Sequence, residues 1–72
     1  MENFQNKLNL IKEKIRNIDK PLILELGVKE GRSTEMFLEV CDKNDGNLIS
    51  VDILDCSKIS RNPRWKFIHS SD

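Results

Sequence analysis

The sequence predicts an α/β fold in which helices flank a parallel sheet of about three strands. Two observations lead to this class. Helical and strand-like segments alternate along the 72 residues, and the strand-like segments are short apolar runs bounded by turn residues. The length allows one small domain, residues 1–72, in which an amphipathic helix (1–20) precedes the remainder (21–72). Strands joined through helices in this way make right-handed crossovers.

The first predicted element is a helix over residues 2–19. Five apolar residues recur at steps of three and four and form one stripe: Phe4, Leu8, Ile11, Ile15 and Ile18. Pro21 ends this element, because the residue before a proline avoids the helical region.

Leu22–Leu26 is predicted to be the first strand, and its nearly continuous apolar character is typical of a strand covered on both faces. A second helix is predicted after Gly31, with Phe37, Val40 and Cys41 on one face. It ends in the turn cluster 42–46, where Gly46 is suited to a left-handed cap.

Residues 47–53 are predicted to form the second strand, and 54–63 a polar connection with room for one helical turn. A third strand begins at Trp65, with Trp65 and Phe67 in the core and His69 at the surface. This second connection is short for a parallel crossover.

Composition narrows the possible partners. Twelve basic and twelve acidic side chains cancel, so the chain has no general attraction to nucleic acid or to an anionic membrane. No apolar run approaches the roughly 20 residues that span a bilayer, and the first ten residues do not resemble a secretion signal. Cys41 and Cys56 form neither a CxxC pair nor a zinc pattern, which indicates reduced thiols in a cytoplasmic protein without a metal site. We expect Cys41 in the core and Cys56 exposed in a loop.

Candidate ligand-binding residues follow the predicted strands, since ligands of parallel sheets bind beyond the strands' carboxyl ends. Gly27 permits a tight turn and close approach of a ligand, and Gly31 lets the next helix begin close to the sheet. Asp52, 25 positions after Gly27, ends the second strand and suits two ribose hydroxyls. The polar segment 70–72 follows the third strand and suits a base edge.

Other interpretations of these residues stay open. In these alternatives, the two glycines only shape a strand-to-helix turn, Glu25 forms a buried pair with a lysine, and Asp52 caps the following turn. Two phosphate-binding motifs are excluded. A P-loop needs four residues between its glycines and then a lysine, and a GxGxxG fingerprint needs glycine where Lys29 stands.

The segments "LELGVKEGRST", "ISVDI" and "WKFIHSSD", in this order, resemble the first half of a class I S-adenosylmethionine-dependent methyltransferase. The similarity is to the small-molecule branch that includes cephalosporin-hydroxylase-like proteins, and it covers about residues 20–72. It implies a three-layer Rossmann-like parallel sheet, truncated to about three strands in the order 3-2-1. It also implies S-adenosylmethionine as cofactor, held by the following residues: Glu25, Gly27 and Gly31 around the methionine part, Asp52 on the ribose, and Ser71 and Asp72 at the adenine.

The same resemblance sets a limit on activity. The family sheet has seven strands, and the fourth, whose loop carries substrate and catalytic residues, has no counterpart here. We therefore expect no methyl transfer by the 72-residue chain alone, and no residue stands out as a catalytic base. The first strand would have an open edge, covered by the missing carboxyl-terminal half or by a second copy. The alternative function is a small non-enzymatic α/β module that self-associates or binds a nucleotide-like ligand weakly.

Overall fold

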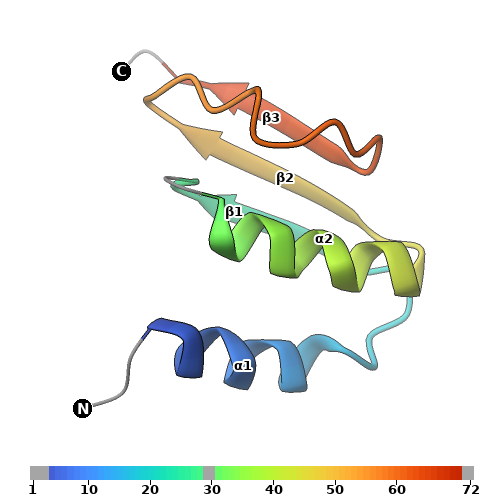
Figure 1. Ribbon diagram of the computed structural model, residues 1–72. Coiled ribbons are helices and arrows are strands. Elements are labelled where there is room, and N and C mark those ends of the chain that lie inside the picture. Colours follow the sequence, from blue (N-terminus) through green and yellow to red (C-terminus); the bar gives the residue numbers. More distant parts are fainter. Residues whose placement is uncertain (1–3, 29–30, 71–72) are drawn as a thin grey trace.

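The computed structural model describes residues 4–28 and 31–70 and shows a small α/β fold (Figure 1). Its elements in chain order are α1 (Phe4–Ile15), β1 (Leu22–Leu26), α2 (Arg32–Asn44), β2 (Asn47–Asp52) and β3 (Trp65–His69). The three strands form one parallel sheet in the order β1-β2-β3, which is the predicted 3-2-1 order read from the other edge. The parallel direction of β3, across a short connection, is thereby confirmed.

The register of the sheet aligns the carboxyl ends of the strands. Leu26 is paired with Val51, and Asp52 with His69. As a result, the loop that follows β1 and the acid that ends β2 lie at the same edge. This edge is where ligands bind in parallel α/β sheets.

The C-terminus of α2 differs from the prediction in one residue. The left-handed position is Asp45, at φ 57°, and not Gly46. Glycine is required at position 46 for a packing reason, because a Cβ there would lie 2.5 Å from the carbonyl oxygen of Pro21. That oxygen already accepts a hydrogen bond from the Asn47 amide at 2.8 Å, so the two chain segments run in close contact.

The first helix is shorter than predicted and ends at Ile15. The segment that follows is held by α2, since the Asn44 side-chain amide donates to the carbonyl oxygens of Arg16 at 2.7 Å and Ile18 at 2.9 Å. These bonds replace the last helical turn that the apolar stripe suggests.

A small apolar core lies between α2 and the sheet. Leu38, Cys41 and Leu48 are its buried members, and Ile23, Phe37 and Trp65 pack against it. The expected core position of Cys41 is confirmed, because this residue is fully buried.

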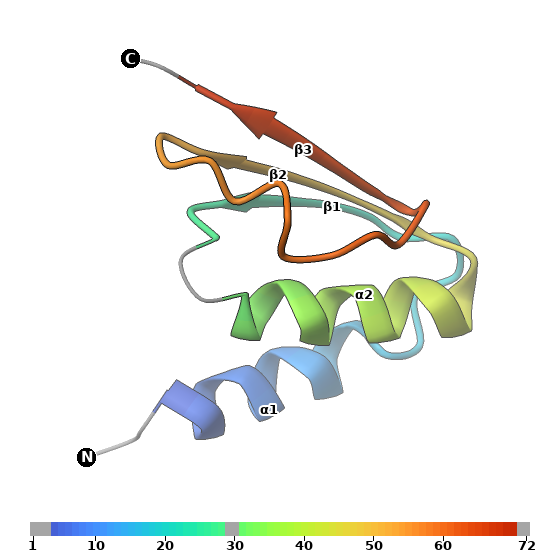
Figure 2. The ribbon, with the colours of Figure 1, turned by 45° about the horizontal axis from the view of Figure 1, so that its top comes forward.

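The expected three-layer arrangement is wrong for the described residues, which form two layers. Both helices lie on the same side of the sheet, and α1 packs beside α2 (Figure 2). The other side of β1 is left open, with Leu22, Leu24 and Leu26 exposed to 74%, 64% and 77%. The sequence pattern of β1 indicated burial on both faces, but no described element reaches the second face.

The connection between β2 and β3 contains no helical turn, contrary to the prediction. Three side-chain oxygens accept hydrogen bonds from amides two residues further on: Asp55 from Ser57, Ser60 from Asn62, and Asn62 from Arg64. Such local bonds compete with helical hydrogen bonding and hold the connection in successive turns. Across the described ranges, no helix has the length and apolar character to span a membrane.

Candidate functional site

The glycine loop after β1 begins with a residue whose backbone angle favours glycine. Gly27 has φ 90°, a conformation that side chains disfavour, and its amide donates to the carbonyl oxygen of Val51 at 2.7 Å. Among the described residues, none has an atom within 4 Å of a Cβ built on Gly27. Glycine is therefore needed at position 27 for its positive φ angle and not to avoid a clash with these residues.

Gly31, the second glycine, has a different environment. It is the N-cap of α2 at φ 85°, and a Cβ there would lie 2.6 Å from Cγ2 of Ile59 in the β2–β3 connection. The absence of a side chain lets the connection pack against the start of α2. The interpretation that the glycines shape the strand-to-helix turn is therefore supported at this position.

Asp52 connects the two ends of the candidate site. Its Oδ2 accepts a hydrogen bond from the Val28 amide at 2.7 Å, and its Oδ1 accepts one from the Leu54 amide at 2.9 Å. The second bond confirms that Asp52 caps the turn after β2. The first bond brings the carboxylate against the glycine loop, 24 residues away in sequence.

Cys56 is not the exposed loop thiol that the sequence suggested. It is 8% exposed, and its Sγ lies 3.7 Å from Oδ2 of Asp52. Burial raises the pKa of the Cys56 thiol, and the negative charge of Asp52 raises it further. The residue is therefore a protonated neighbour of the acid and not a reactive thiolate.

Glu25 is buried beneath the loop and accepts three hydroxyl hydrogen bonds. Ser33 donates to Oε2 at 2.5 Å, and Thr34 and Ser50 donate to Oε1 at 2.7 Å each. The alternative prediction for Glu25 was an ion pair with a lysine. The structure instead places hydroxyl groups from α2 and β2 within hydrogen-bond distance of its carboxylate. We call Glu25, Ser33, Thr34 and Ser50 the hydroxyl network.

The hydroxyl network extends to β3 through the single tryptophan of the chain. Trp65 Nε1 donates to the Ser50 hydroxyl oxygen at 2.8 Å. One acid thus links β1, the first turn of α2, β2 and β3. Sequence reasoning identified Glu25 but missed its three donors; the signal was a serine inside an apolar strand and two hydroxyl residues at the start of a helix.

The third predicted part of the site is described only at its beginning. The Ser70 amide donates to the carbonyl oxygen of Asp52 at 2.9 Å, so the chain leaving β3 lies against the end of β2. Ser71 and Asp72 fall outside the described residues. His69 is exposed, as expected, with Nε2 at 2.9 Å from the Ile53 carbonyl oxygen.

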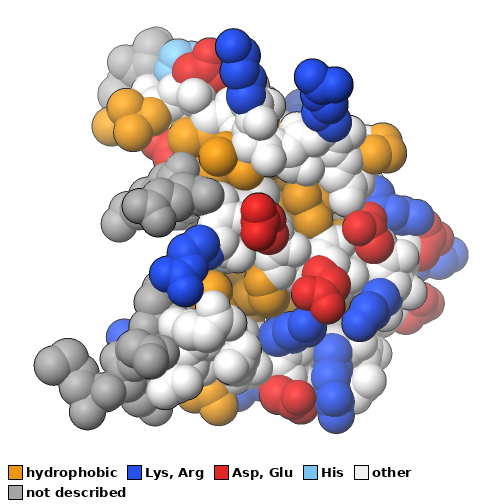
Figure 3. All heavy atoms as spheres, viewed as in Figure 1, with side chains coloured by type: hydrophobic (Ala, Val, Ile, Leu, Met, Phe, Trp, Pro, Cys, Tyr) orange, Lys and Arg blue, Asp and Glu red, His pale blue; other side chains and the backbone are white. Residues whose placement is uncertain are grey.

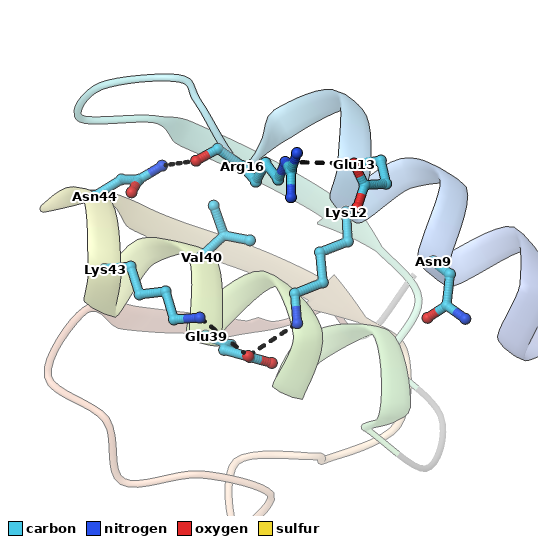
Figure 4. A pocket seen from close by; sticks show the side chains of 8 residues that line it. All are labelled: Asn9, Lys12, Glu13, Arg16, Glu39, Val40, Lys43 and Asn44. Atoms are coloured by element: carbon cyan, nitrogen blue, oxygen red, sulfur yellow. Dashed lines mark hydrogen bonds and ion pairs between the residues drawn. The ribbon is translucent and has the colours of Figure 1, made fainter.

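A separate cavity of about 500 Å³ lies between α1 and α2 (Figure 4). The carboxylate of Glu39, one of the lining residues, pairs with Lys12 at 2.8 Å and Lys43 at 3.6 Å. The surrounding helix surface mixes acidic and basic side chains (Figure 3). This cavity is lined by none of the predicted cofactor-binding residues, and its charged side chains form ion pairs, of which Lys12–Glu39 joins the two helices.

Comparison of the chain with protein-family models, with curated proteins and with solved structures found no match. Within residues 4–28 and 31–70, no group of three or more histidine, cysteine or acidic side chains is placed to hold a metal ion. In the part of the chain that the structure describes, the glycine loop and the buried carboxylate of Asp52 lie together at the carboxyl edge of the sheet.

Proposed function

We propose that this chain binds S-adenosylmethionine as the amino-terminal half of a Rossmann-like methyltransferase domain. The observation that supports the proposal most is the hydrogen bond between the Val28 amide and Asp52 Oδ2. It brings together two parts that the resemblance assigns to one cofactor, the glycine loop and the ribose-binding acid.

The chemistry of the residues fits the cofactor. A carboxylate oxygen accepts more than one hydrogen bond, so ribose hydroxyls can join the backbone amides on Asp52. Glycine at position 27 allows the methionine part to approach the backbone closely. In this proposal Glu25 positions the glycine loop and does not bind the cofactor itself. Its carboxylate holds the start of α2 through Thr34 and the middle of β2 through Ser50.

Calorimetric titration of the purified chain with S-adenosylmethionine, and with its demethylated product, tests the proposal. We expect saturable binding that Asp52→Asn weakens about 10- to 100-fold, since one charged acceptor of hydroxyl hydrogen bonds is lost. Asp55→Asn is the matched control, because Asp55 is an exposed acid three residues away in the same connection. Ligand-induced shifts of the Gly27 and Val28 amide resonances provide a readout that does not depend on variants.

No heat and no amide shift at saturating ligand would refute the proposal. Equal weakening by both variants would refute the role of Asp52. The alternative, a non-enzymatic module that self-associates, is favoured by a different observation, the exposed leucines of β1. Absence of ligand binding together with a defined oligomer would support that alternative.

A further inference from the structure

The side of the sheet that faces away from the helices is mainly apolar. Leu48, Ser50 and Asp52 of β2 are buried on the helix side, so the alternating residues point to the other side. The strand register places Ile49 between Leu24 and Lys66, Val51 between Leu26 and Ile68, and Asn47 beside Leu22. We call this surface the open sheet face; its residues are the apolar Leu22, Leu24, Leu26, Ile49, Val51 and Ile68 and the polar Asn47 and Lys66.

This face is exposed to an extent that a parallel sheet rarely shows. Leu22, Leu24 and Leu26 are each at least 64% exposed, and Ile68 is 42% exposed. Sheets of parallel strands are ordinarily covered on both faces. An apolar surface of this kind on a small protein marks a contact site.

The chain exposes more surface than a compact monomer of its mass is expected to expose. The chain exposes 5395 Å². A compact monomer of 8.4 kDa is expected to expose about 4600 Å². The difference is about 800 Å², which is similar to one partner's share of a standard protein–protein interface.

Pairing through the free edge of β1 does not suit a second copy. Helix α1 lies beside α2 in the helix layer and extends past the β1 edge (Figures 1 and 2). A copy paired along this edge would bring its own helix layer toward α1, which already extends past β1. The open sheet face has no such obstruction, because both helices lie on the opposite side.

The charges also permit contact between two copies. The formal net charge is zero, so association meets no overall repulsion. On the open sheet face, the described strands contribute one charged side chain, Lys66 on the edge strand β3. The side chains of β1 on this face are all apolar, so a second copy would meet no charge at the centre of the contact.

We propose that two copies of this chain associate by stacking their open sheet faces, as the two sheets of a sandwich stack about 10 Å apart. Leu24, in the middle of β1, then lies inside the contact. The glycine loop and Asp52 lie at the carboxyl edge of the sheet, outside the stacked surfaces. The proposal is therefore independent of cofactor binding.

Sedimentation equilibrium over a range of protein concentrations tests this dimer. The wild-type chain is expected to dimerise below about 100 μM, and Leu24→Lys to weaken dimerisation at least about tenfold, because a charge enters an apolar contact. Leu10→Lys is the matched control: Leu10 is 53% exposed on α1, away from the open sheet face. Leu24→Thr retains the strand preference and serves as a second variant if Leu24→Lys disturbs the fold.

Amide hydrogen exchange distinguishes the stacked dimer from edge pairing. The Pro21 carbonyl group and the Gly27 amide form hydrogen bonds with β2. In a parallel pair, alternate residues of a strand bond to the same neighbour, so the odd-numbered residues of β1 face β2 and the Leu24 amide faces the free edge. Fast exchange of this amide in the dimer supports stacking, whereas protection overturns it in favour of edge pairing. A monomer at all concentrations, or equal effects of the position 10 and position 24 variants, also overturns the proposal.

Discussion

Replacing Glu25 tests whether the hydroxyl network is a main source of stability. Glu25→Gln keeps an oxygen for Thr34 and Ser50 and removes the acceptor of the Ser33 hydroxyl. Hydrogen bonds to a charged group contribute about 1.5–3 kcal/mol each, and the serine can reorient toward the new amide. We expect a net loss of about 1–2 kcal/mol for this variant.

Glu25→Ala removes every acceptor of the network. Thr34 and Ser50 are completely buried, so their hydroxyl groups lose a partner without gaining water, and a cavity forms beside them. We expect a loss of about 3–5 kcal/mol, most of the stability of a domain this small. For a chain of this length, each kcal/mol lowers the melting temperature by about 4–8 °C.

The assay uses Trp65, whose indole donates to Ser50 within the network. Tryptophan fluorescence and circular dichroism during urea unfolding should show a lower midpoint for both variants, with Trp65 emission changed even in the folded state. Glu13→Gln is the control, because Glu13 forms an exposed pair with Arg16 and should cost under about 0.5 kcal/mol. If Glu25→Gln and the control have the same unfolding free energy, the reasoning about the network is wrong.

Two further predictions concern packing and the thiols. Gly46→Ala should lower the free energy of unfolding by about 1–3 kcal/mol, because the new Cβ meets the Pro21 carbonyl oxygen. Gly27→Ala should lower it by about 1–2 kcal/mol, from backbone strain alone. Chemical denaturation measures both losses, and a larger loss at Gly27 would contradict the absence of described atoms beside it. Burial raises the pKa of both Cys41 and Cys56, so a thiol reagent should modify the folded protein slowly at mildly alkaline pH and faster as pH rises. Because the pKa values of these thiols are raised in the folded protein, the free energy of unfolding should fall as pH rises beyond the ordinary thiol range. Rapid labelling of the native protein at neutral pH would contradict the protection of the two thiols.

Local sequence patterns predicted the elements of this fold well. The apolar run 22–26 is β1 with the expected bounds, and the predicted strand 47–53 differs from β2 by one residue. Parallel pairing of all three strands was also predicted, although the helical turn expected between β2 and β3 is not found in the described connection. These features depend on neighbouring residues and on the crossover rule, which are both readable along the chain.

The candidate site was predictable in part. Gly27, Gly31 and Asp52 were identified because strand ends and glycines are visible in sequence, and the structure brings the acid to the loop. The donors of Glu25 and the burial of Cys56 were not predicted. They depend on which side of the sheet a residue faces and on which loop folds over it.

The spacing of apolar side chains and the positions of glycine and proline determine where strands and helices form along this chain. They do not determine how layers stack, because β1 has the same apolar pattern whether one face or both are covered. Only the tertiary arrangement shows that α1 packs beside α2 and leaves Leu24 exposed. Burial results from contacts between distant segments, and no local pattern encodes those contacts.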